Sequence, residues 1–115
     1  MRSGFERTLA AQLKRLNVTY QYEPVKLPYV LERTYCPDFY VVKSDVYIEA
    51  KGKLDQDTRT KMIAVKKAHP ELDIRFVFMK ADNKLSKNSK QTYAQWAEKN
   101  GFQWADGTIP EDWLK

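Results

Sequence analysis

The sequence predicts an α/β fold in which a mixed central sheet is flanked by helices. The chain has 115 residues, about the size of one small domain, and we expect a single domain over residues 1–115. Hydrophobic residues make up 43% of the chain, which is enough for a packed core. Apolar spacing indicates the order helix, two or three strands, helix, strand, helix, strand. Such a mixture is typical of a sheet with helices packed on its faces.

The first helix is predicted over Ser3 to Leu16. Its apolar residues recur every three or four positions and therefore share one helix face: Phe5, Leu9, Leu13 and Leu16. Ser3 is the expected N-cap, and Glu6 three positions later completes a capping-box pattern. Asn17 can end the helix because asparagine tolerates the left-handed backbone conformation.

Extended structure is predicted after this helix. Residues 18–27 alternate between aromatic or branched side chains and polar ones, which suits a strand interrupted at Pro24. Residues 28–36 look irregular. We expect a connector of extended character there, because Pro28 and Pro37 both bias the preceding residue away from helix.

A hairpin is predicted next. Its strands run from Asp38 to Val42 and from Val46 to Lys51, with a tight turn near residues 43–45. With the turn centred between positions 43 and 44, the numbers of paired residues add up to 87. This register places Asp38 directly opposite Glu49, so their carboxylates should lie side by side.

The remaining predicted elements are a helix over Asp55 to Ala68 stopped by Pro70, a central strand over Ile74 to Met79, a surface loop over Lys80 to Gln91, a helix over Tyr93 to Lys99, and a strand over Phe102 to Trp104. Met62, Ile63 and Val65 are expected on the buried side of the second helix. In the C-terminal tail, Trp113 and Leu114 can pack onto the body of the domain.

The amino-acid composition restricts the kinds of partner and site that the protein can have. Lysine and arginine number 20 against 15 acidic residues, a formal net charge of +5, which favours a polyanionic partner. The single cysteine excludes an internal disulfide and a cysteine-rich zinc site. No apolar run approaches the roughly 20 residues of a membrane span, so we expect a cytoplasmic protein without a membrane partner.

The candidate chemistry lies in the predicted hairpin. Side chains alternate along a strand, so Glu49 and Lys51 share one face while Ala50 points to the other. Adjacent carboxylates at Asp38 and Glu49 repel each other, and a divalent cation relieves that repulsion. Mg²⁺ prefers oxygen ligands, which both carboxylates and the Ala50 carbonyl can supply, and we expect Mn²⁺ to substitute. With the Lys51 ammonium beside metal and water, the natural reaction is phosphodiester hydrolysis.

A collinear series of blocks spans nearly the whole chain: Arg2-Ser3-Gly4-Phe5-Glu6, Lys26-Leu27-Pro28-Tyr29-Val30, Tyr35-Cys36-Pro37-Asp38-Phe39, Glu49-Ala50-Lys51-Gly52, His69-Pro70-Glu71-Leu72-Asp73-Ile74-Arg75 and Ile109-Pro110-Glu111-Asp112-Trp113. Together the blocks resemble the phage endonuclease I family of the PD-(D/E)xK nuclease superfamily. Short PD and ExK matches are weak alone, whereas the ordered series is specific.

The resemblance implies a restriction-endonuclease-like fold and a metal-dependent endonuclease acting on branched DNA such as four-way (Holliday) junctions. The metal site of that family uses the carboxylates matching Asp38 and Glu49. It also uses the lysine matching Lys51 and the helix glutamate matching Glu6. The family forms a domain-swapped homodimer, so Glu6 would complete the partner's site and residues 28–36 would bridge the two halves. A phage or prophage protein of this kind would act in the host-cell cytoplasm.

Plainer interpretations stay open beside these. A capping-box role explains Glu6 without a metal, and the hairpin charges can be a solvated group on an ordinary hairpin. Four basic residues are candidate DNA contacts, although surface cations are commonly only solvated: Lys53, Arg59, Lys84 and Lys87. His69 invites a general-base role, but we expect it to end the second helix. Cys36 is expected to be a small buried residue, and the tryptophans to be core, with base stacking as the minor alternative.

Two rival functions remain for the same sequence. The first is a sequence-specific nicking, homing or restriction-like endonuclease with the same metal site. The second is a DNA-binding protein that retains the fold without catalysis. Cleavage of a four-way junction and of its matched duplex, with and without Mg²⁺, separates all three.

Overall fold

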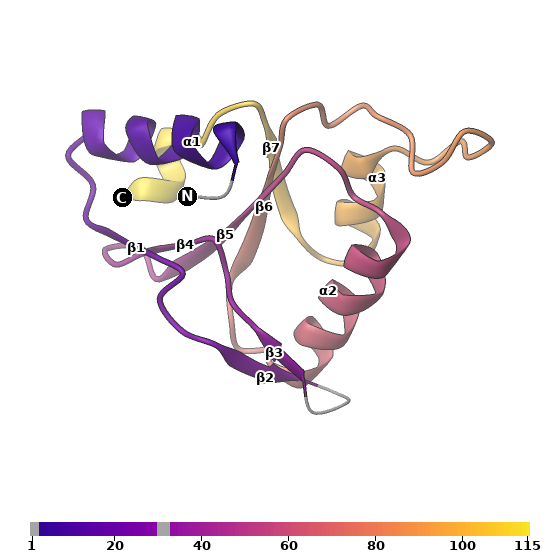
Figure 1. The fold of residues 1–115 in the computed structure, drawn as a ribbon, viewed down its shortest axis with the longest axis horizontal. Coiled ribbons are helices and arrows are strands. Elements are labelled where there is room, and N and C mark those ends of the chain that lie inside the picture. Colours follow the sequence, from indigo (N-terminus) through magenta and orange to yellow (C-terminus); the bar gives the residue numbers. More distant parts are fainter. Residues whose placement is uncertain (1–2, 30–32) are drawn as a thin grey trace.

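The computed structural model describes residues 3–29 and 33–115 (Figure 1). Its helices in these ranges are α1 (Gly4–Arg15), α2 (Gln56–Ala68) and α3 (Tyr93–Lys99), with a 3-10 helix η2 (Glu111–Leu114). Its strands are β1 (Tyr20–Tyr22), β2 (Leu27–Tyr29), β3 (Arg33–Tyr35), β4 (Phe39–Val41), β5 (Val46–Lys51), β6 (Ile74–Phe78) and β7 (Gln103–Asp106). No helix among the described residues is long and apolar enough to cross a membrane.

The central sheet has five strands in the order β1-β4-β5-β6-β7. Strands β1, β4 and β5 pair antiparallel, whereas β5, β6 and β7 pair parallel. Parallel neighbours require a crossover connection, and α2 and α3 provide the two crossovers. The predicted α/β class with a mixed, helix-flanked sheet is therefore confirmed.

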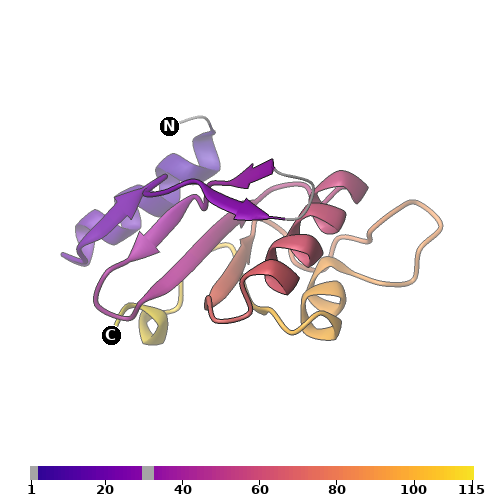
Figure 2. The ribbon, with the colours of Figure 1, turned by 90° about the horizontal axis from the view of Figure 1, so that it is seen from below.

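Helices cover both faces of this sheet (Figures 1 and 2). Helix α1 and η2 pack on one face, and α2 and α3 pack on the other. The alternation of side chains along β6 shows the division, because Val77 joins the α1 cluster while Phe76 and Phe78 join the α2 cluster. Each face thus has its own apolar core.

The first helix forms as predicted. Ser3 is the N-cap, and its hydroxyl accepts a hydrogen bond from the Glu6 N–H at 3.0 Å. Leu9 and Leu13 are fully buried against the sheet. Asn17 follows the helix with a φ of 55°, the left-handed conformation expected at this position.

The predicted hairpin register is also confirmed. Phe39 pairs with Ile48 and Val41 with Val46, so the numbers of paired residues add up to 87. The first strand is shorter than predicted and begins at Phe39, one residue after Asp38. Helix α3, the loop before it and the burial of the C-terminal tail also agree with the predictions.

The connector predicted over residues 28–36 has the expected extended character in its described part, but it is not irregular. Strand β2 pairs antiparallel with β3, with Leu27 opposite Tyr35, in a separate two-stranded sheet. The prolines favoured extended backbone, but a side-chain pattern this short carries no pairing signal. Residues 30–32 lie outside the described residues, and the predicted role of this segment as an inter-subunit bridge stays a prediction.

The prediction is also wrong for one residue of α2 that was expected in the core. Met62 and Val65 are fully buried, but Ile63 is 45% exposed. Successive helix residues are rotated by about 100°, so Met62 and Val65 share a stripe that Ile63 leaves. The helix begins after the N-cap Asp55 and ends before His69, as predicted.

Candidate active site

The second strand of the hairpin presents two charges on one face, as predicted. The Lys51 Nζ lies 3.4 Å from the Glu49 Oε2. Glu49 is only 2% exposed, and the Lys51 side chain is 25% exposed. The intervening Ala50 packs against the α1 cluster on the other face of the sheet. A buried glutamate therefore lies next to a lysine that still reaches solvent.

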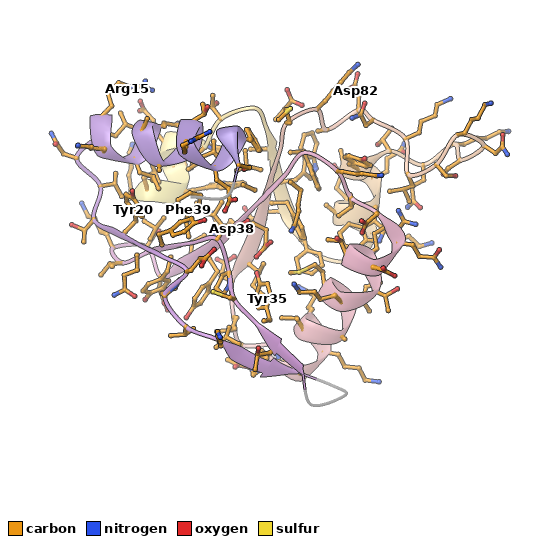
Figure 3. All side chains as sticks on the ribbon, viewed as in Figure 1. Arg15, Tyr20, Tyr35, Asp38, Phe39 and Asp82 are labelled. Carbon is orange, nitrogen blue, oxygen red and sulfur yellow. The ribbon has the colours of Figure 1, made fainter. Side chains whose placement is uncertain are left out.

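Asp38, which is labelled in Figure 3, immediately precedes the neighbouring strand β4 and joins this pair. Its Oδ2 accepts a hydrogen bond from the Ala50 N–H at 2.8 Å, which ties it to β5. Asp38 is 7% exposed. The structure thus brings Asp38, Glu49 and Lys51 together, as the register predicted.

The environment of Asp38 disfavours the ionised form of its carboxyl group. Burial, and then the charge of Glu49, raise the pKa of Asp38 from 3.8 to about 8, although the Ala50 N–H and Lys51 act in the opposite direction. Two carboxylates in one buried group cannot both be charged cheaply without a cation. One lysine does not compensate fully, so the group is short of positive charge.

Lys51 remains an ammonium in this setting. Burial alone lowers the pKa of Lys51, but the charges of Glu49 and Asp38 outweigh burial and raise the pKa above its ordinary value. A charged lysine cannot act as a proton acceptor. It can hold an oxygen atom of water or phosphate, and it can offset negative charge in a transition state.

Glu6 reaches the edge of the same group within one chain. It is 7% exposed, and its two carboxylate oxygens accept hydrogen bonds from the Ser3 hydroxyl at 3.2 Å and the Tyr22 hydroxyl at 3.1 Å. The charge of Glu6 also contributes to the raised pKa values of Asp38 and Lys51. Glu6 is therefore both a residue of the capped first turn and part of the electrostatic surroundings of the site.

Tyr35 belongs to the site and was missed by the sequence analysis. It is fully buried at the end of β3, and its hydroxyl donates a hydrogen bond to the Glu49 Oε1. Burial and the charge of Glu49 raise the pKa of Tyr35, so the phenol keeps its proton. Its position two residues before the Pro37-Asp38 motif was the one available signal.

The donor set suits a hard divalent cation that keeps several waters. Among the described residues, no three His, Cys, Asp or Glu side chains are grouped so as to hold a metal ion by themselves. Two close, buried carboxylates that are short of positive charge nevertheless match Mg²⁺, which takes one or two carboxylates together with water and substrate oxygens. The predicted ligand role of the Ala50 carbonyl stays a prediction.

The predicted DNA-binding residues lie in three places. Lys53 is exposed on the segment between β5 and α2, and its charge acts on Asp55 together with that of Lys51. Arg59 has a structural contact, because its guanidinium donates a hydrogen bond to the Leu54 carbonyl at 2.8 Å. Two more residues are exposed on the loop that projects from the body in Figure 1: Lys84 and Lys87.

Other candidates lie outside the site. His69 ends α2, as predicted, with its Nδ1 at 3.6 Å from Glu71. Trp96 and Trp113 are buried, in agreement with a core role, while Trp104 is only partly buried. A surface cavity of about 360 Å³ lies at the C-terminal end of α1, lined by residues such as Asn17, and is remote from Glu6.

Comparisons with known proteins assign this chain to a family. The family model of phage endonuclease I matches residues 1–115. The chain is 39% identical over 117 residues to Endonuclease I of Escherichia phage T7, covering 99% of this chain and 78% of the relative. It is 40% identical over 112 residues to Endodeoxyribonuclease 1 of Enterobacteria phage T3, covering 95% of this chain and 73% of the relative.

Paired acidic residues and a lysine at the open end of a hairpin can together bind a divalent cation and a phosphate. The chain belongs to the phage endonuclease I family.

Proposed function

We propose that this protein is a divalent-metal-dependent DNA endonuclease that is selective for branched DNA such as four-way junctions. The observation that carries the proposal is the buried group of Asp38 and Glu49 beside the Lys51 ammonium. Membership of the phage endonuclease I family supports DNA as the substrate. Selectivity for branches rests on the resemblance to junction-resolving enzymes.

Asp38 and Glu49 are the proposed ligands of Mg²⁺ or Mn²⁺, with the Ala50 carbonyl as a further ligand. A bound divalent ion would lower the pKa of a coordinated water and polarise a phosphoryl oxygen. The protein holds Asp38 in place through the Ala50 N–H and keeps both carboxylates largely out of bulk water. Burial and the charge of Glu49 disfavour the ionised form of Asp38 in the absence of an ion, which favours ion binding.

Lys51 has the proposed role of orienting the attacking oxygen and offsetting charge on the phosphate. Its Nζ lies beside Glu49, and its side chain is exposed enough to reach a DNA backbone on the surface. Because its pKa is raised, it acts as a fixed cation rather than as a base. Lys53, Arg59, Lys84 and Lys87 are the proposed phosphate contacts on either side of the site.

We further propose that the working unit is a homodimer in which Glu6 completes the site of the partner subunit. The charge of Glu6 acts on Asp38 and Lys51 within one chain, which supports a place for Glu6 near the site. Exchange of identical segments between two chains preserves such a neighbourhood when the connecting segment extends. Residues 28–36 connect the part that contains Glu6 to the part that contains Asp38.

The decisive experiment compares a four-way junction with a linear duplex of the same arm sequences, each with Mg²⁺ and with EDTA. We expect cuts near the branch of the junction in Mg²⁺, an intact duplex, and no cleavage in EDTA. Efficient cleavage at one defined site of the duplex would favour the sequence-specific alternative. Binding without cleavage in either Mg²⁺ or Mn²⁺ would favour a non-catalytic DNA-binding protein.

A further inference from the structure

A buried hydrogen bond outside the predicted site residues joins Tyr35 to Glu49. The Tyr35 side chain is 0% exposed and Glu49 is 2% exposed, so their hydrogen bond is shielded from water. Tyr35 comes from the β2–β3 hairpin, whereas Glu49 lies in the central sheet. The contact is therefore a tertiary one that links the small sheet to the site. Figure 3 shows Tyr35 on the α2 side of Asp38.

The two oxygens of the Glu49 carboxylate have different partners. Oε1 accepts the hydrogen bond from the Tyr35 hydroxyl, and Oε2 lies 3.4 Å from the Lys51 Nζ. These contacts fix the plane of the carboxylate from both sides. Each oxygen has a further lone pair, so Glu49 retains the capacity to bind a cation while both contacts persist.

A buried tyrosine needs some acceptor, and a backbone carbonyl elsewhere would have satisfied it. Here the acceptor is the most buried carboxylate of the site. Partners behind a metal ligand fix its orientation, and their loss commonly reduces metal affinity or activity by about 10- to 100-fold. The same arrangement recurs at lower burial in Tyr22, whose hydroxyl contacts Glu6.

We propose that Tyr35 is a positioning residue, whose hydroxyl orients the Glu49 carboxylate for divalent-metal binding. This inference rests on the proposed function, because it assigns Glu49 to the metal. Tyr35 touches neither DNA nor the reacting phosphate in this role. Its removal should therefore weaken metal binding more than it slows cleavage at saturating metal.

The test compares wild type, Tyr35→Phe and the control Tyr93→Phe. Tyr93 is also a buried tyrosine of the α2-side cluster, so both changes remove one phenol oxygen from the same core. Calorimetric titration of the DNA-free proteins with Mn²⁺ should show about 10- to 100-fold weaker binding for Tyr35→Phe, and no change for Tyr93→Phe. The Mg²⁺ concentration for half-maximal junction cleavage should rise in parallel, while the rate at saturating Mg²⁺ stays within about threefold.

Mn²⁺ affinity of Tyr35→Phe within twofold of wild type would overturn the inference. If Tyr35→Phe does not unfold cooperatively, two replacements of similar shape at position 35 decide instead. 4-Aminophenylalanine keeps a donor and should restore wild-type Mn²⁺ affinity, whereas 4-methylphenylalanine lacks one and should not. Equal affinity with both replacements would contradict the inference. Failure of wild type itself to bind Mn²⁺ and cleave DNA would instead reject the proposed function.

Discussion

The hairpin site and the lysine-rich loop over residues 80–91 place charged side chains in opposite settings. At the site, Asp38 and Glu49 are buried and act on each other and on Lys51. In the loop, Lys84 and Lys87 are exposed and project away from the body (Figure 1). Burial strengthens interactions between charges, whereas water and salt screen exposed ones. We therefore expect the site to control chemistry and the loop to control binding strength.

Removal of the site lysine should reduce cleavage strongly. Lys51→Ala should reduce junction cleavage by about 10³-fold, because it deletes a cation placed beside the developing charge. DNA affinity, measured by gel shift in Ca²⁺, should remain within about threefold, since one phosphate contact contributes little to binding. Asp38→Ala should abolish cleavage because it deletes a proposed ligand of the divalent metal.

Lys53→Ala is the matched control for that change, because Lys53 is a neighbouring but exposed lysine. It should keep cleavage within about tenfold of wild type at saturating DNA. Full activity in Lys51→Ala would remove the distinction between the buried site and the exposed surface.

The second prediction concerns which subunit of the proposed dimer supplies Glu6 to each site. Glu6→Ala and Asp38→Ala should each be inactive, but refolding them together should restore one complete site per heterodimer. Random pairing would then recover roughly a quarter of the wild-type nicking activity, because half of the dimers carry one good site out of two. The measurement is nicking of a junction by the mixture. No recovery would show that Glu6 acts within its own chain.

The third prediction concerns the loop. Lys84→Ala and Lys87→Ala should weaken junction binding with little effect on the cleavage rate of bound DNA. Removing one phosphate interaction should lower the slope of log affinity against log salt by about 0.9. Lys67→Ala, an exposed lysine at the end of α2, is the control and should leave the slope unchanged. Unchanged slopes in both loop variants would indicate that Lys84 and Lys87 are solvated and do not contact DNA phosphates.

The fourth prediction concerns the dependence of folding stability on pH in the absence of metal. The pKa of Asp38 is about 8 in the folded protein and ordinarily 3.8, so the folded state holds a proton that the unfolded chain has released. Stability should therefore fall as the pH rises from 5 to 8 in EDTA, by up to about 1.4 kcal/mol per pH unit. Asp38→Asn should flatten this dependence of the melting temperature. If the stability of the wild type rose between pH 5 and 8, the result would contradict repulsion between the buried carboxylates of Asp38 and Glu49.

The sequence predicted the local parts of this site better than its tertiary parts. The register of Asp38 against Glu49 follows from strand alternation and a short turn, both of which are written in adjacent residues. The contact from Tyr35 to Glu49 depends on how a second hairpin folds onto the sheet. Nothing in the local pattern of residues 28–36 specifies that docking.

The same limit applies to Glu6 and to the second helix. A capping-box pattern indicates where α1 begins, but not that its first turn lies near Asp38. Ile63 was misplaced because a three-residue apolar set does not define which side of a helix faces the sheet. Local patterns therefore predicted elements and register, and packing between elements determined the rest.

Asp38 and Glu49 are proposed to form a buried acidic pair that a divalent cation completes. Thermal unfolding of wild type and Asp38→Asn at pH 8, in EDTA and in 10 mM Mg²⁺, tests it most directly. A Mg²⁺ concentration of ten times the dissociation constant adds about 1.4 kcal/mol to the free energy of unfolding. Mg²⁺ should therefore raise the wild-type melting temperature by about 5 °C. Asp38→Asn should be more stable than wild type in EDTA and should respond little to Mg²⁺. Equal responses of the two proteins to Mg²⁺ would contradict the account.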